Sequence, residues 1–112
     1  MQTDTLGTTF AALVNPTRRA ILSRLQSKSM NVNELREPFT ISAPAISRHL
    51  KVLESAGLVT HRQQRQQRIY SLQAAGFEEA LLWMEQYRRY WDQQFDALDA
   101  ALKARKIDND DT

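Results

Sequence analysis

The sequence of 112 residues contains no cysteine. This absence excludes disulfides, thiolate metal sites and cysteine nucleophiles. Glycine and proline are scarce, with three of each, and so few turn residues favour long helices over a sandwich of many short strands. No purely apolar run exceeds five residues, which is far too short to span a membrane. The opening MQTDTLGTTF also lacks the basic and apolar regions of a signal peptide, so we expect a cytoplasmic protein.

The charge of the chain is unevenly distributed. Hydrophobic residues make up 42% and charged residues 25%, which is typical of a globular domain. Residues 1–68 hold ten Lys or Arg and four Asp or Glu, a net +6, whereas residues 69–112 hold five and nine, a net −4. A basic first part favours a polyanionic partner, although small domains often carry uneven charge without one.

Two helices are predicted at the start of the chain. Leu6, Phe10 and Leu13 follow helical spacing. Asn15 and Pro16 end this helix and begin another, because Asn is a good N-cap and Pro fits the first helical turn. The arginines of the second helix are expected to face largely outward: Arg18, Arg19 and Arg24.

A helix-turn-helix is predicted over about residues 31–56. Asn31 is followed three residues later by Glu34, the spacing of a capping box. Ser42 is expected to cap the second helix of the pair, and Gly57 to end it in a left-handed conformation. Two helices joined by a short turn in this way form the helix-turn-helix pattern.

A two-stranded hairpin is predicted next, over about residues 58–72. The runs LVTHR and QRIYSL are rich in β-prone residues and are separated by QQRQ. The segment carries Arg62, Arg65 and Arg68 and no acidic residue. Because QQRQ lacks Gly and Asn, we expect a longer, mobile tip and not a tight turn. A basic hairpin directly after a helix-turn-helix is typical of a winged helix.

The candidate DNA-binding residues lie on the second helix of the pair and on the hairpin. Burying the apolar positions of that helix exposes its polar face, and a helix fits the major groove with its N-terminal residues at the base edges. Arg48 suits a bidentate contact to guanine, whereas Lys51 is better placed for the phosphate backbone. A merely solvated polar face is the alternative. The candidates are Ser42, Ala43, Pro44, Ser47, Arg48, Lys51, Arg62, Arg65 and Arg68.

A long helix is predicted over about residues 74–104, and residues 105–112 form a polar tail that we expect to be disordered. Apolar residues recur along the helix at alternating spacings of three and four, interrupted only at Arg88. This stripe exceeds what one small domain can cover, although each residue alone could be plain core. The candidate dimer-interface residues, from the first and last helices, are Leu6, Phe10, Leu13, Trp83, Tyr87, Trp91, Phe95 and Leu98.

No catalytic set is recognisable in the sequence. His49 lies at the edge of a buried helical face and has no evident ligand set, since the other histidine, His61, lies on the hairpin. It is expected to be a packed or hydrogen-bonded helix residue. There is no Ser-His-Asp set, no facing pair of carboxylates and no phosphate loop, so we do not expect an enzyme.

Three segments, LVNPTRRAILSRL, NVNELREPFTISAPAISRHLKVLESAGLV and QRIYSL, resemble the winged-helix repressors of the ArsR type. The resemblance runs from about residue 6 to 72. It implies a mainly α, homodimeric winged helix-turn-helix of about five helices, in one domain over 1–104. It also implies an interface between the first and last helices, with two recognition helices in successive major grooves of a palindromic operator. The aromatic terminal helix is similar to a non-metal branch of the family.

The sequence departs from the metal-sensing members of that family. Asn31 and Asn33 stand where metal sensors carry cysteines, and neutral amides are poor ligands for soft metals. The terminal helix has no histidine, and its Asp92, Asp96 and Asp99 have the spacing of a solvated face. We therefore predict no metal and no cofactor. Ala43 replaces a frequent Gln, so it offers a base only a methyl group.

The sequence thus predicts a homodimeric repressor that binds duplex DNA through residues 42–56 and the basic hairpin residues 61–68. We expect any effector of this repressor to be a small molecule or a protein, which the sequence does not identify. The alternative is a winged helix that contacts other proteins and does not itself recognise DNA.

Overall fold

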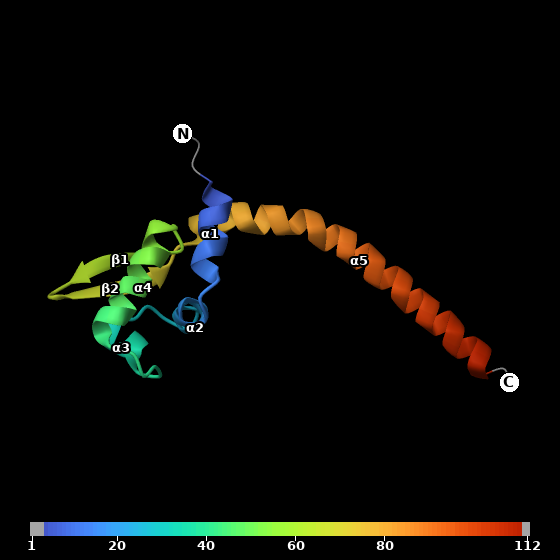
Figure 1. Ribbon diagram of the computed structural model, residues 1–112, viewed down its shortest axis with the longest axis horizontal. Coiled ribbons are helices and arrows are strands. Elements are labelled where there is room, and N and C mark those ends of the chain that lie inside the picture. Colours follow the sequence, from blue (N-terminus) through green and yellow to red (C-terminus); the bar gives the residue numbers. More distant parts are fainter. Residues whose placement is uncertain (1–3, 111–112) are drawn as a thin grey trace. The chain divides into compact units, whose positions relative to one another are not determined.

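The computed structural model describes residues 4–110, and side chains for residues 4–106. Within this range the chain forms five helices and one two-stranded antiparallel sheet (Figure 1). The mainly α fold with a small hairpin is therefore confirmed. In chain order the elements are α1 (Thr5–Leu13), α2 (Pro16–Leu25), α3 (Val32–Arg36), α4 (Ala43–Ser55), β1 (Val59–Gln64), β2 (Gln67–Leu72) and α5 (Ala74–Asp110).

The chain divides into two compact units, Met1–Ala80 and Leu81–Thr112. The first unit holds α1 to α4, the hairpin and the first turns of α5. The second consists of the remainder of α5. A single domain over 1–104 stays a prediction.

The core of the first unit is built on the buried stripe of α4. Ile46, Leu50 and Leu53 follow one another at i, i+4 and i+7, and all three are fully buried, as predicted. Each such side chain contributes about 1.5–3 kcal/mol on transfer from water. The other large buried side chains of this core are Ile21, Leu22, Leu25, Met30, Leu35, Leu58, Val59 and Tyr70.

Three helices begin at the caps that the sequence predicts. The side chains of Asn15, Asn31 and Ser42 accept hydrogen bonds from backbone N–H groups in the first turns of α2, α3 and α4. At α3 the capping box is complete, because the Glu34 carboxylate also accepts from the Asn31 N–H, at 3.1 Å. These bonds satisfy donors that a helix start otherwise leaves without partners.

The arginines of α2 do not all face outward, contrary to expectation. Arg18 Nε donates to the carbonyl of Ala12 at 2.7 Å. Arg24 Nη2 donates to the carbonyl of Glu34 at 2.9 Å. Both side chains are partly buried, and they join α2 to the end of α1 and to α3. Helical periodicity places a side chain around the axis but does not show which neighbouring carbonyls are within its reach.

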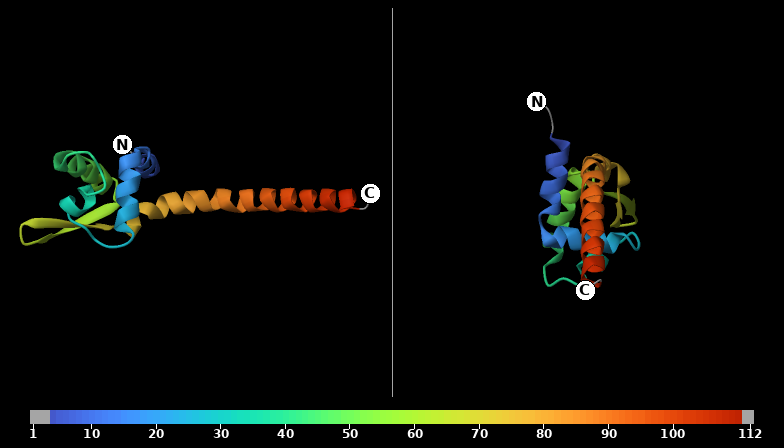
Figure 2. Two further views of the ribbon diagram at one scale, coloured as in Figure 1. Left: turned by 90° about the horizontal axis from the view of Figure 1, so that it is seen from below. Right: turned by 90° about the vertical axis from the view of Figure 1, so that its right-hand side faces the viewer.

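The hairpin turn is tighter than expected. Strands β1 and β2 pair in register from Val59 opposite Leu72 to Gln64 opposite Gln67, which leaves a loop of only Arg65 and Gln66. Arg65 takes the positive φ of 59° that such a turn requires at its first central position. The prediction of a longer tip was wrong because a residue other than Gly or Asn occupies the left-handed position. The left view of Figure 2 shows the tip projecting beyond the helices of the first unit.

Helix α5 continues to Asp110. The expectation of disorder from residue 105 is therefore wrong for residues 105–110, while residues 111–112 lie outside the described range. The regular spacing of apolar residues along α5 ends near Leu102. A polar segment can nevertheless extend an existing helix, because each added residue forms one more hydrogen bond and no new helix has to be nucleated.

The end of α4 lies against the start of α5 through two glycines. Gly57 has a φ of 77° and ends α4 in a Schellman motif, with hydrogen bonds from its N–H to Glu54 and from the N–H of Leu58 to Leu53. Gly76 packs directly on this turn. A Cβ on Gly76 would overlap the Gly57 carbonyl and lie 2.9 Å from the Leu58 nitrogen.

We expect Gly76→Ala to lower the free energy of unfolding by about 1–3 kcal/mol or more, because the clash is with backbone that cannot move aside cheaply. The control is Gly7→Ala, whose new Cβ has only atoms of the Asp4 side chain as its three nearest neighbours. That side chain caps α1, so the control is expected to cost at most about the 1 kcal/mol of a lost cap. Urea denaturation followed by circular dichroism measures both changes. Equal stability of Gly76→Ala and wild type would show that the contact is not this tight.

Candidate nucleic-acid interface

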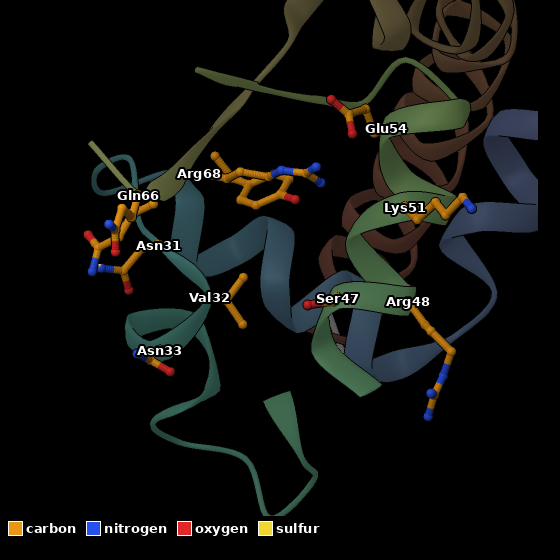
Figure 3. Close-up of a pocket in the computed structure, with 11 residues that line it drawn as sticks. Asn31, Val32, Asn33, Ser47, Arg48, Lys51, Glu54, Gln66 and Arg68 are labelled. Atoms are coloured by element: carbon orange, nitrogen blue, oxygen red, sulfur yellow. Dashed lines mark hydrogen bonds between the residues drawn. The ribbon is translucent and has the colours of Figure 1, made fainter. Parts of the chain in front are cut away.

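The polar face of α4 borders a pocket of about 700 Å³ between α3, α4 and the hairpin (Figure 3). Ser47, Arg48 and Lys51 line it from α4, and Arg68 lines it from β2. Figure 3 shows Ser47 pointing towards Val32, whereas Arg48 and Lys51 point to the side of α4 away from α3. Four of the predicted DNA-binding side chains therefore border one open cavity.

Three further predicted residues lie where α4 begins. Ser42, Ala43 and Pro44 form the N-terminal end of α4, and Ser42 Oγ is already engaged as the cap, accepting from the Ala45 N–H at 3.3 Å. A Ser42 contact to DNA would therefore use its remaining lone pair or its own hydroxyl proton.

The arginines of the hairpin are divided between its two faces. Arg68 is opposite Gln63, on the face that carries the buried Tyr70. Arg62 alternates to the other face, where its Nη1 donates to Gln64 Oε1 at 2.9 Å. Arg65 lies in the turn. The sequence places all three arginines on the hairpin as candidates, but the strand register brings only Arg68 to the pocket beside α4.

Amide side chains outside the predicted DNA-binding set contribute to the same pocket. Asn31 Nδ2 donates to Gln67 Oε1 at 3.2 Å, and this bond joins α3 to the hairpin. Gln66 and Asn33 also line the pocket. The long-range pairing of Met30 with Tyr70 also holds these segments side by side. No local sequence signal could have revealed it.

The electrostatics of the surface favour an anion. Within the part of the chain that the structure describes, Arg48, Lys51, Arg65 and Arg68 form no ion pair. Glu54 is the one acidic side chain that lines the pocket, and its carboxylate is paired with His61 Nδ1 at 2.5 Å. Cations without partners are therefore available to phosphates.

His49 packs at the edge of the buried face of α4, as the sequence predicts. It is half-buried, and its Nδ1 lies 3.4 Å from Arg18 Nη1. Burial lowers the pKa of the His49 imidazole below its ordinary value of 6.5, and the positive charges of Arg18 and Arg48 lower it further. The neutral ring is therefore the favoured form, in which Nδ1 can accept from the guanidinium.

A helix-turn-helix followed by a two-stranded basic hairpin defines a winged helix-turn-helix of the DNA-binding type. Residues 15–61 match the family model described as "Bacterial regulatory protein, arsR family". A solved structure of an ArsR family transcriptional regulator, RHA00566, superposes with a TM-score of 0.72 at 30% identity, over 80% of this chain and 98% of that one.

Two curated relatives agree with this assignment. The transcriptional repressor SdpR of Bacillus subtilis (strain 168) is 36% identical over 75 residues, which are 67% of this chain and 83% of SdpR. The HTH-type transcriptional regulator Rv2034 of Mycobacterium tuberculosis (strain ATCC 25618 / H37Rv) is 45% identical over 65 residues, which are 58% of this chain and 61% of Rv2034. The chain belongs to the ArsR family, and it is a DNA-binding transcriptional regulator.

Asn31, at one of the positions where a metal sensor would carry a cysteine, has a structural role here. Its side chain caps α3 and donates to Gln67. No group of three or more His, Cys, Asp or Glu side chains within the described residues could hold a metal ion. Separately, none of the helices that the structure describes combines the length and apolar character of a membrane span.

We expect an NMR titration to give His49 a pKa below 6.5, and the pKa to rise in Arg48→Gln but not reach the ordinary value, because burial remains. On acidification, His49 is therefore protonated at a higher pH in the unfolded chain than in the folded chain. Stability therefore falls as the pH drops from about 6.5 towards the lowered pKa and is unaffected above that window. Arg36→Gln, which removes an exposed arginine of α3, is the control. A wild-type pKa at or above 6.5 would contradict the assignment.

Proposed function

We propose that the chain is a cytoplasmic, homodimeric repressor that recognises a palindromic operator through α4 and the hairpin. The observation that carries the proposal is the fixed polar face of α4. The burial of Ile46, Leu50 and Leu53 holds this helix, while the side chains of Arg48 and Lys51 stay exposed and pair with no carboxylate of the described residues. The name of SdpR, a transcriptional repressor, supports repression as the direction of regulation.

The residues of the proposed DNA surface have distinct roles. Arg48 and Ser47 contact base edges in the major groove, where a guanidinium pairs with guanine in a bidentate manner. Lys51 contacts the phosphate backbone, and the N-terminal turn of α4 at Ser42, Ala43 and Pro44 lies close to a phosphate. Arg62, Arg65 and Arg68 of the hairpin contact the backbone or the adjacent minor groove.

The proposed dimer uses the apolar stripes of α1 and α5. Helix α5 exposes large side chains along its length, with Trp91 52%, Phe95 61% and Leu98 55% exposed. Monomeric proteins rarely leave so many apolar side chains together in water. The proposed interface residues on α5 are Trp83, Tyr87, Trp91, Phe95 and Leu98, joined by Leu6, Phe10 and Leu13 on α1.

We expect Arg48→Ala to cost about 1–3 kcal/mol of operator binding per half-site and to relax specificity. Fluorescence anisotropy on the chain's own promoter region and on a scrambled duplex measures both. The control Lys103→Ala removes the same charge from the second unit and is expected to bind normally. If wild type fails to bind any duplex at low salt, the proposed function is wrong.

We expect Arg65→Ala to weaken binding to all duplexes by a similar factor, because an interaction with the DNA backbone carries no sequence information. The slope of log affinity against log salt should become shallower by about 0.9 for each phosphate that the variant no longer neutralises. A salt titration of wild type and variant on specific and scrambled duplexes provides the measurement. An effect confined to the specific duplex would instead assign Arg65 to base recognition.

We expect Phe95→Glu to weaken self-association at least about tenfold, because it places a charge in the apolar stripe. The control Gln93→Glu introduces the same charge two positions away, off the stripe. Sedimentation equilibrium measures the dissociation constant of each variant. Identical dimerisation of Phe95→Glu and wild type would exclude this part of α5 from the interface.

A further inference from the structure

A second groove lies on the other side of α4 from the pocket beside α3. It has a volume of about 650 Å³ and runs between α1, α2 and α4. Its walls are mostly apolar, with Ala11 and Ala12 on α1 and Val52 and Ala56 on α4. Val52 is 42% exposed although it is aliphatic, because nothing in residues 4–80 covers it. Volumes of this size are ordinary for small-molecule sites.

Three cations border this groove, and no acidic residue lines it. Arg18 is held in place, with Nε donating to Ala12 at 2.7 Å and Nη2 to Ala11 at 3.3 Å. Arg48 and Lys51 are exposed and form no ion pair with any described residue. An apolar wall with cations at one edge complements a molecule that has an apolar body and an anionic end.

The groove is separate from the proposed dimer stripe of α1. At 100° per residue, Thr8 and Ala11 lie on the opposite side of that helix from Leu6, Phe10 and Leu13. Dimerisation through Leu6, Phe10 and Leu13 therefore leaves Thr8 and Ala11 accessible. A second copy of the chain paired through that stripe of α1 would not fill the groove.

We propose that this groove binds an amphipathic carboxylate, such as an aliphatic acid of medium length, as the effector of the regulator. The apolar body lies between Ala11 and Val52, where it removes aliphatic surface from water. The carboxylate lies at Arg48 and Lys51, where charge-assisted hydrogen bonds form with cations that have no ion-pair partner among the described residues.

The position of the groove connects this ligand to DNA binding. Arg48 and Lys51 line both the groove and the pocket on the DNA-binding face. A carboxylate bound to them neutralises two of the cations that the operator requires, so ligand and DNA exclude one another. Binding free energies are reciprocal, and the ligand therefore lowers DNA affinity by the same factor as DNA lowers ligand affinity. This second step rests on the proposed function, whereas ligand binding itself does not.

The first experiment measures binding to the full chain without DNA, by isothermal titration calorimetry. The probes are decanoate, 1-decanol as the uncharged analogue, and acetate as the carboxylate without an apolar body. We expect decanoate to bind at least about tenfold more tightly than either control. Absence of decanoate binding, or equal binding of 1-decanol, would overturn the proposal, because the cations would then contribute nothing.

Variants locate the site and separate it from the exposed stripe of α5. Ala11→Phe fills the groove, and Ser23→Phe adds the same bulk on the exposed side of α2. Val52→Glu places a carboxylate in the groove, with Val52→Gln as its neutral counterpart. We expect Ala11→Phe and Val52→Glu each to weaken decanoate binding at least about tenfold relative to its control. Unchanged binding of decanoate in both variants would exclude the groove as its site.

Circular dichroism verifies that each variant is folded. In the wild type, changes in the amide chemical shifts of Ser55 and Ala56 on adding decanoate locate the ligand independently.

The second experiment adds decanoate to the complex with promoter DNA. Decanoate is expected to weaken DNA binding of wild type and Ser23→Phe but not that of Ala11→Phe. If decanoate binds the groove and DNA affinity does not change, its role as effector is wrong although the site stands. If no duplex is bound even without decanoate, the proposed function fails, and calorimetry still decides whether the groove binds a carboxylate.

Discussion

The burial of one apolar stripe on α4 is the constraint on which the rest of the site depends. Ile46, Leu50 and Leu53 have no solvent exposure, so the rotation of the helix about its own axis is fixed. Fixing that rotation determines which polar side chains face outward, because side chains follow the helix at 100° per residue. Arg48 and Lys51 owe their availability to this packing and not to any local interaction of their own.

The hairpin depends on the same packing through its contacts with the helices. The N–H groups of Met30 and Tyr70 each donate to the other residue's carbonyl, at 3.1 and 2.8 Å, and the Asn31 side chain bonds to Gln67. These bonds hold Arg68 beside α4, while the alternation of the strand turns Arg62 away. The basic surface is therefore shaped by strand register as much as by the number of arginines.

Local sequence signals accounted for the element order and for the caps of three helices. Asn15, Asn31 and Ser42 begin helices, and Gly57 ends one, because each effect acts within a few residues of the chain. The signals were insufficient at the hairpin tip, where Arg65 adopts a left-handed conformation that single-residue preferences disfavour. They were also insufficient at the end of α5, which continues through polar residues.

The sequence by itself determined the winged helix-turn-helix, because spacing and capping are local and the buried stripe of α4 is periodic. The tertiary structure decided which side chains meet. Arg18 reaches the end of α1 and His49, Gly76 packs on the Gly57 turn, and Arg48 and Lys51 border two cavities at once. Each of these depends on contacts between segments distant in the chain, and no pattern within a single segment specifies such contacts.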